Sequence, residues 1–158
     1  MKAATLTQLK KEMTHLSHDQ LLNICLRLTK YKRDNKELLT YLLFEAENEE
    51  GYVEQLKAEI DQQMSDINVS NLYVRRKGLR KVIRWVDRFL RYSGNKETEI
   101  EVRIHLCKKM KEHQMPYRSI NAFMTIYDSQ IKKIKAALTK LHEDLQYDYL
   151  QEIKEVER

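Results

Sequence analysis

Apolar side chains recur along the sequence at the spacing of one face of an α-helix. In residues 52–66 and just beyond, successive apolar positions are 3, 4, 4 and 3 residues apart, at Val53, Leu56, Ile60, Met64 and Ile67. A helix turns once every 3.6 residues or so, and these side chains therefore share one face. The same pattern predicts helices over about 6–15, 18–30, 35–45 and 72–92. In the first three helices we expect the inward-facing residues to be Leu6, Leu9, Met13 and Leu16, then Leu21, Leu22, Cys25 and Leu28, then Leu38, Leu39, Leu42 and Leu43.

Capping signals mark where several of these helices begin. A capping box has a Ser, Thr or Asp whose side chain accepts from a backbone N–H three residues on, and a Glu or Gln there that reaches back. Four pairs have this spacing: Thr5 and Gln8, Ser17 and Gln20, Asp34 and Glu37, and Thr98 and Glu101. At the other end of the helix over 72–92, Ser93-Gly94 predicts a C-terminal glycine cap.

The C-terminal third contains an ambiguous segment followed by a very regular one. Residues 99–107 alternate apolar and charged side chains as a strand does, but a lone strand would have no partner, so we predict a helix over 99–113. We expect Pro116 to end that helix and to open the next one. Residues 120–145 then follow a heptad repeat, which fits packing within the chain or a seam for a second copy. A single helix as far as Glu157 would be long for this domain size, and we therefore predict a bend near His142–Asp144.

The fold class follows from this pattern together with composition. The 158 residues include one Pro and three Gly, which argues against a sandwich of many short strands. We predict one all-α domain over 1–158 with six to eight helices, as an irregular bundle or as stacked antiparallel hairpins. No apolar run approaches the roughly 18 residues that a membrane span needs, and no signal-peptide pattern opens the sequence. Cys25 and Cys107 are widely separated, which favours two reduced core thiols and a cytoplasmic location.

Charge is unevenly distributed along the chain. The formal net charge is +5, yet residues 45–70 hold eight acidic side chains and one basic one. Residues 71–118 hold 14 basic and five acidic side chains. Such segregation brings an acidic helix directly before a basic one.

The basic helix is the main candidate for a functional surface. At about 100° per residue, one face of it collects Lys77, Arg80, Lys81, Arg84, Arg88 and Arg91, opposite an apolar face. We call these six residues the basic stripe. The guanidinium group of arginine can donate two parallel hydrogen bonds to a phosphate or a carboxylate, and a basic stripe is typical of nucleic-acid binding. Tyr73 and Tyr92 flank it and could stack on bases, although ordinary amphipathic packing explains them too.

Four interpretations of the basic stripe remain open at this point. The acidic segment 45–66 could pair with it inside the fold, or the stripe could bind a protein partner. It could instead bind nucleic acid or, less readily, a membrane surface.

Signals of catalysis or metal binding are weak. Glu12-x-x-His15 has the spacing of a di-iron motif, but such a site needs a second copy and two further Glu on facing helices. No Gly-rich phosphate loop or Gly-x-Ser-x-Gly elbow occurs. We therefore predict a non-enzymatic protein with no metal, cofactor or small-molecule substrate.

The N-terminal residues carry a family resemblance. The run Leu9-Lys-Lys-Glu-Met, the turn Leu16-Ser17 and the start Asn35-Lys-Glu resemble a family of small, uncharacterised, all-helical bacterial proteins found mainly in Bacteroidetes. The resemblance covers about residues 6–44, and it implies an all-α fold in a bacterial cytoplasm. It carries over no catalytic residue. Together these features predict a protein-interaction or scaffold module that binds an unidentified partner or self-associates through the 120–145 heptads. The alternative is a nucleic-acid-binding protein that uses the basic helix 75–91 on phosphates.

Overall fold

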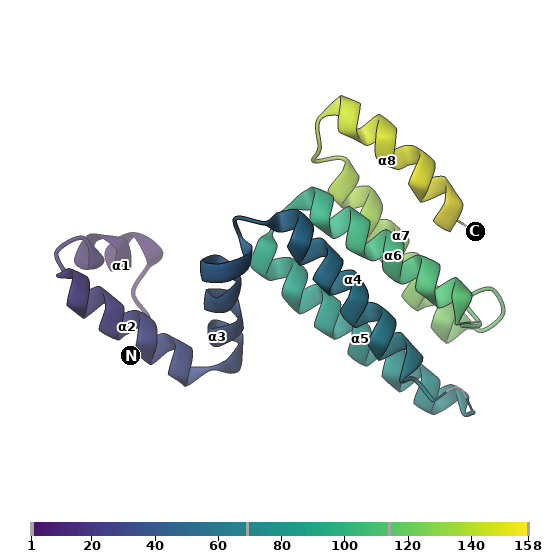
Figure 1. Ribbon diagram of the computed structural model, residues 1–158, viewed down its shortest axis with the longest axis horizontal. Coiled ribbons are helices and arrows are strands. Elements are labelled where there is room, and N and C mark those ends of the chain that lie inside the picture. The colour runs from purple at the N-terminus through teal and green to yellow at the C-terminus, as the bar shows by residue number, and fades with distance from the viewer. Residues whose placement is uncertain (1, 69, 114, 158) are drawn as a thin grey trace. The chain divides into compact units, whose positions relative to one another are not determined.

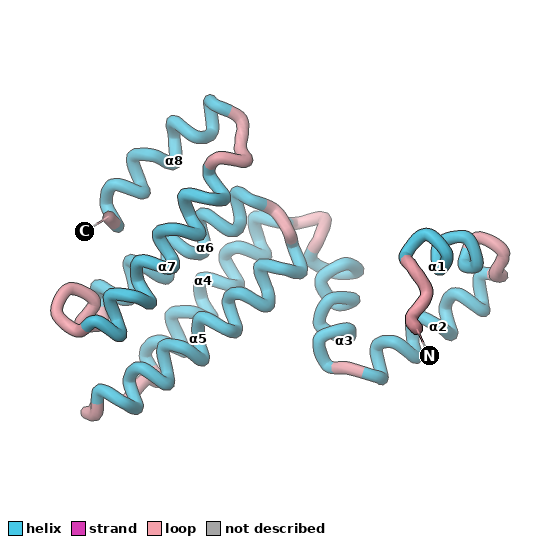
Figure 2. Tube along the Cα trace, turned by 180° about the vertical axis from the view of Figure 1, so that it is seen from behind, coloured by secondary structure: helices cyan, strands magenta, loops and turns pink. Residues whose placement is uncertain are grey.

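The computed structural model describes residues 2–68, 70–113 and 115–157, and these residues form helices and loops without a strand. The all-α prediction is confirmed (Figures 1 and 2). In chain order the described elements are α1 (Leu6–Met13), α2 (His18–Tyr31), α3 (Arg33–Thr40), a π-helical turn (Tyr41–Glu45), α4 (Glu49–Ser65), α5 (Leu72–Ser93), α6 (Lys96–Glu112), α7 (Asn121–Leu138) and α8 (Glu143–Val156). None of these helices is long and apolar enough to cross a membrane.

The chain groups into two compact units, Met1–Phe44 and Glu45–Arg158, which we call unit 1 and unit 2. The expectation of one domain over 1–158 stays a prediction. Unit 2 contains α4 to α8 and nearly all of the buried side chains, whereas Tyr41 is the one described residue of unit 1 that is buried.

Unit 1 corrects the expectation that its leucines face inward. Leu16, Leu21 and Leu39 are half-buried, but Leu6, Leu9, Met13, Leu22, Cys25, Leu28, Leu38, Leu42 and Leu43 are exposed. The reason is size, because three helices of 8, 14 and 8 residues cannot enclose a core of their own. Exposure of Cys25 also makes the prediction of two core thiols wrong for that residue.

Unit 2 is organised around α6. This helix contacts α4, α5, α7 and α8, and its buried residues lie on every side of it. Consecutive helices α4, α5, α6 and α7 run antiparallel to their neighbours in the chain (Figures 1 and 2). A helix that is buried all round needs no polar face. The alternation at Ile100, Val102, Ile104 and Leu106, which resembles a strand, therefore comes from a central helix.

The capping predictions were half right. Thr5 and Ser17 form complete capping boxes with Gln8 and Gln20. The pairs that begin at Asp34 and Thr98 do not form boxes. There, α3 begins at Arg33 without a side-chain cap, and α6 is capped by Asn95 three residues before Thr98.

Two predictions about the C-terminal third have different outcomes. Pro116 does not open a helix. It lies in a loop in which its carbonyl oxygen accepts hydrogen bonds from the backbone N–H groups of Ser119 and Ile120, and α7 begins five residues later at Asn121. The break near His142–Asp144 is confirmed, since α7 ends at Leu138 and α8 begins at Glu143. Of the eight heptad side chains, Tyr127, Ile134 and Leu138 are buried and the other five are half-buried, which fits packing within the chain.

Candidate functional site

Helix α5 holds the basic stripe on the side opposite its buried face. Leu79, Val82, Val86 and Leu90 point into the core of unit 2. The helix begins where the Asn71 side chain accepts from the backbone N–H groups of Tyr73 and Val74, at 2.8 and 3.4 Å. It ends at Gly94, whose φ of 68° is the left-handed conformation of a C-terminal cap. With both ends fixed and one face buried, the stripe is held on a straight, 22-residue support.

Five of the six stripe residues are exposed: Lys77, Arg80, Lys81, Arg84 and Arg91. Among the described residues, no ion pair or side-chain hydrogen bond joins any of these five to an acidic side chain. Arg88 differs, because it is half-buried and its guanidinium lies 5.3 Å from the centre of the Phe89 ring. The stripe thus presents five solvated cations along one face.

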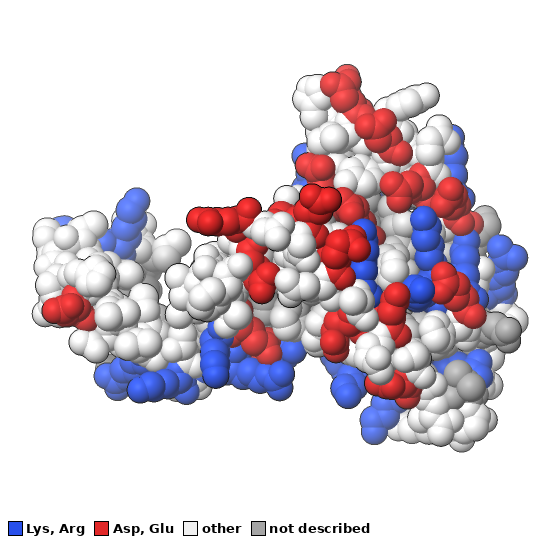
Figure 3. Space-filling model, viewed as in Figure 1, with Lys and Arg blue, Asp and Glu red and all other residues white. Residues whose placement is uncertain are grey.

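Three acidic side chains of α4 have partners outside the basic stripe. Asp61 lies 2.6 Å from His105 Nε2 and 3.4 Å from Lys109 Nζ, both on α6. Glu49 accepts hydrogen bonds from Thr98 and Ser93, and Glu54 pairs with Lys57 at 2.9 Å. Figure 3 shows acidic and basic side chains lying next to one another on the face of unit 2 that this view presents. Among the described residues, no acidic side chain of segment 45–66 forms an ion pair with the five exposed cations, although Asp66 lines a groove together with three of them.

Where α4 and α5 meet, three stripe cations line a groove of about 380 Å³. Lys77, Lys81 and Arg84 form one wall, and Gln63, Asp66 and Asn68 belong to the other. Gly78 lets α5 lie close to the segment that follows α4, since a β-carbon there would lie 3.1 Å from the Ile67 side chain. The groove thus brings cationic and amide donors into one concave surface, with the Asp66 carboxylate beside them.

The stripe has an energetic cost in the free protein. Lys77 and Lys81, Arg80 and Arg84, and Arg84 and Arg88 are like-charged neighbours one turn apart. Each such pair destabilises a helix by roughly 0.2–0.5 kcal/mol, or about 1 kcal/mol for the three together. A bound polyanion removes this repulsion, whereas folding alone gains nothing from it.

A small cleft lies at the N-terminal end of α5, next to the stripe. Its lining comes from α5 and from the beginning of α7, and its volume is about 210 Å³. The lining residues are Leu72, Tyr73, Arg76, Ile120, Ala122 and Phe123. Tyr73 is 65% exposed, and the Arg76 guanidinium carbon lies 6.0 Å from the centre of its ring.

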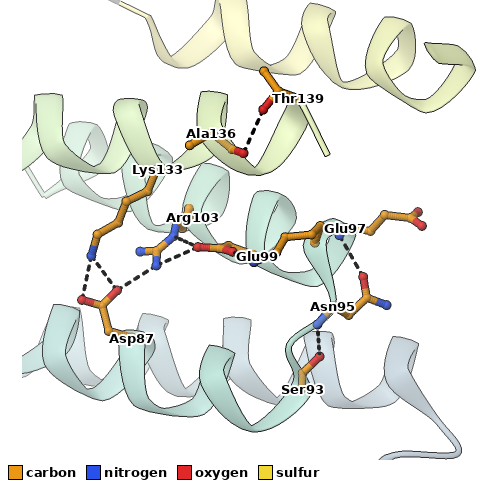
Figure 4. A network of polar contacts seen from close by, with 10 residues as sticks. Asp87, Ser93, Asn95, Glu97, Glu99, Arg103, Lys133, Ala136 and Thr139 are labelled. Carbon is orange, nitrogen blue, oxygen red and sulfur yellow. Dashed lines mark hydrogen bonds and ion pairs between the residues drawn. The ribbon is translucent and has the colours of Figure 1, made fainter. Parts of the chain in front are cut away.

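A buried polar network connects α5, α6 and α7, and no sequence motif indicated it (Figure 4). Arg103, 4% exposed, donates to Asp87 Oδ1 at 2.8 Å, to Gln130 Oε1 at 2.8 Å and to Glu99 Oε1 at 3.2 Å. Lys133 donates to both oxygens of Asp87, at 2.9 and 2.8 Å. Each of these five side chains has at least one partner inside the network, and the network therefore ties the three helices together.

The two carboxylates of the network are stabilised in their charged form. Burial raises the pKa of the Asp87 carboxyl, but hydrogen bonds from Lys133 and Arg103 outweigh it, and the net pKa is below the ordinary value. Burial likewise opposes ionisation of Glu99, and its pKa is lowered overall by Lys96 and Arg103.

The remaining candidates for chemistry do not come together. Glu12 and His15 are both exposed on unit 1. No cluster of three or more His, Cys, Asp or Glu side chains within the described residues could hold a metal ion. Cys107 is buried, and burial raises the pKa of its thiol to about 12.

Unit 1 has a second kind of surface, which is apolar. A groove of about 240 Å³ between α2 and α3 is lined mainly by Cys25, Leu28, Leu38, Leu39 and Leu42. Beside it a wider groove of about 620 Å³ runs from Thr29 to Phe44, with Lys30, Lys32 and Lys36 among its lining residues. Leu43 and Phe44 are 65% and 75% exposed. Large apolar side chains that are exposed together are typical of interaction surfaces and ligand-binding grooves.

We compared the chain with protein-family models, with curated proteins and with solved structures, and none of the three comparisons gave a match.

Proposed function

We propose that this protein is a non-enzymatic binding protein whose basic stripe on α5 binds the phosphate backbone of a nucleic acid. The observation that carries the proposal is the row of five exposed cations that have no acidic partner among the described residues. A line of exposed cations suits a partner that is recognised by its charge. Phosphates at regular intervals are such a partner, and arginine and lysine are the side chains that bind them.

The length of the stripe fits the phosphate backbone of a nucleic acid better than it fits a single anion. Lys77 and Arg91 are 14 residues apart, and at 1.5 Å per residue that is about 21 Å of helix. Several phosphates can be neutralised over this length. For five contacts to a single strand, the logarithm of the binding constant falls with the logarithm of salt concentration with a slope of about −3.5. From 50 to 200 mM salt, affinity would then fall about 130-fold.

The test is fluorescence anisotropy with labelled 20-nucleotide DNA and RNA at salt concentrations between 50 and 200 mM. Arg84→Glu is expected to weaken binding about tenfold or more, because a charge-assisted hydrogen bond contributes roughly 1.5–3 kcal/mol. It should also make the salt dependence shallower. The variant should fold well, since the introduced carboxylate would lie one turn from both Arg80 and Arg88 and would replace repulsion with attraction.

Lys132→Glu is the matched control, because Lys132 is exposed on α7, which carries none of the stripe residues, and the change in net charge is the same. Equal weakening by Lys132→Glu and Arg84→Glu would show non-specific attraction and would contradict the proposal. Absence of binding at 50 mM salt would contradict it as well.

A second candidate is protein interaction through unit 1, favoured by its exposed apolar grooves. Light scattering across a concentration series tests self-association through this surface. Concentration-dependent dimers that are lost in Phe44→Ser would support it. A monomeric mass throughout would exclude self-association and leave a different protein as the partner. We place this binding protein in the bacterial cytoplasm as part of the same proposal.

A further inference from the structure

We infer that the cleft at the N-terminal end of α5 binds one unstacked nucleobase, so that the nucleic acid bound by this protein is single-stranded. The inference rests on the proposed function, because it gives the phosphate-binding stripe a site for a base at one end. It concerns the cleft formed by Tyr73 and Arg76 of α5 and by Ile120 and Ala122 at the beginning of α7.

The first argument is position. Tyr73 precedes Lys77 by four residues, which places it about 6 Å along the helix and about 40° around it. Its ring therefore lies close to the line of the stripe. A strand whose phosphates follow the stripe reaches the cleft at its end without changing direction.

The second argument is the chemistry of the lining. Tyr73 is 65% exposed, so most of its phenol is open to a ligand. Leu72, Ile120 and Ala122 add apolar contacts, which suit the flat faces of a base. Aromatic side chains that stack on bases, combined with a cationic track for the backbone, are the usual means of binding single strands.

The third argument is Arg76. Its guanidinium carbon lies over the Tyr73 ring, 6.0 Å from the ring centre. Among the described residues it makes no ion pair or side-chain hydrogen bond. Its donors are therefore free for an oxygen of the base or of the adjoining phosphate.

The fourth argument is size. The cleft of about 210 Å³ is smaller than pockets for drug-sized molecules, which are roughly 300–1,000 Å³. A single planar ring system suits it better than a whole cofactor does. In a duplex the bases are paired and stacked, so none is available to enter the cleft without being flipped out.

The experiment compares three labelled probes by anisotropy at 100 mM salt: a 20-nucleotide oligothymidylate, an abasic oligonucleotide with the same number of phosphates, and a 20-base-pair duplex. The protein should bind oligothymidylate more tightly than the abasic strand by roughly 5- to 150-fold, the range of one stacked base. Tyr73→Ala should remove most of that difference and leave binding to the abasic strand and the duplex unchanged. Tyr73→Phe, which keeps the ring, should preserve it.

Two further variants make the test specific to the cleft. Ala122→Leu fills the cleft while leaving Tyr73 in place, and it should also reduce the preference for oligothymidylate. Tyr147→Ala removes a tyrosine that is 69% exposed on α8 and should have no effect.

The outcomes separate this inference from the proposed function. If Arg84→Glu weakens all three probes but Tyr73→Ala changes none, the stripe binds phosphates and the base site is wrong. Equal affinity of the wild-type protein for the abasic and normal strands would overturn the base site in the same way. If no probe binds, both proposals fail.

Discussion

The buried network around Arg103 gives the sharpest prediction about stability. Arg103→Leu removes the donor that the 2%-exposed Gln130 side chain uses and breaks two contacts to carboxylates. An unsatisfied buried acceptor costs roughly 1–3 kcal/mol. Lys133 and Lys96 still pair with Asp87 and Glu99, which limits the loss there. The total loss in the free energy of unfolding should approach about 3–5 kcal/mol, which is typical of breaking a buried ion pair.

The assay is urea denaturation followed by circular dichroism, together with a thermal scan. For a unit of this size, the expected loss corresponds to a fall in Tm of roughly 10–20 °C. Lys133→Met is the control, because Lys133 is partly exposed and Asp87 keeps Arg103, so its cost should be about 1 kcal/mol.

The double variant Arg103→Leu with Gln130→Leu should recover part of the loss, because neither side of that hydrogen bond is then left unsatisfied. A free energy of unfolding within about 1 kcal/mol of wild type for Arg103→Leu alone would refute the stabilising role of the network. So would a loss no larger than that of Lys133→Met.

Three other predictions follow from particular residues. The folded-state pKa values of Asp87 and Glu99 lie below their ordinary values of 3.8 and 4.5. The two carboxylates therefore stabilise the folded protein at pH values above their ordinary pKa. This stabilisation is lost as the pH falls through their folded-state pKa values. Urea titrations between pH 5.5 and 2.5 should show this loss, and a flatter profile in Asp87→Asn; equal slopes in both proteins would contradict it. Cys25 should react with a thiol reagent in the native protein, whereas Cys107, whose pKa burial raises to about 12, should react after unfolding. Two equally fast thiols would disprove the burial of Cys107. Gly94→Ala should destabilise unit 2 by roughly 1–2 kcal/mol, because φ is 68° there and no atom blocks the new methyl group. Gly94→Asn should cost less in the same urea titration, and a neutral alanine variant would argue against the left-handed cap.

Helical periodicity was enough to predict most of unit 2. The apolar spacing in 52–66 and 72–92 corresponds to α4 and α5, and the exposure of the stripe follows from the same periodicity. Whether the acidic segment covers the stripe could not be predicted, because it depends on which neighbour each acid faces. Asp61, for example, lies beside His105 and Lys109 on α6 instead.

The residues that sequence reasoning missed depend on packing between distant segments. Asp87 is the one acidic residue in 72–93, and that isolation was the available signal of an internal partner. Its partners Arg103 and Lys133 are 16 and 46 residues away, beyond any local pattern. The leucines of unit 1 were misplaced for the opposite reason. Their periodicity is helical, but periodicity does not reveal whether another surface is present to cover them.

The central position of α6 has a consequence for folding kinetics. Most helix pairs in unit 2 are consecutive in the chain, such as α4 with α5 and α6 with α7, so each can form as a local hairpin. Proteins rich in such local contacts fold in microseconds to milliseconds. The pairing of α4 with α6 instead joins two hairpins. It requires α6 to contact helices from both hairpins at the same time. We therefore expect the docking of the two hairpins across α6 to be the step at which unit 2 becomes cooperative.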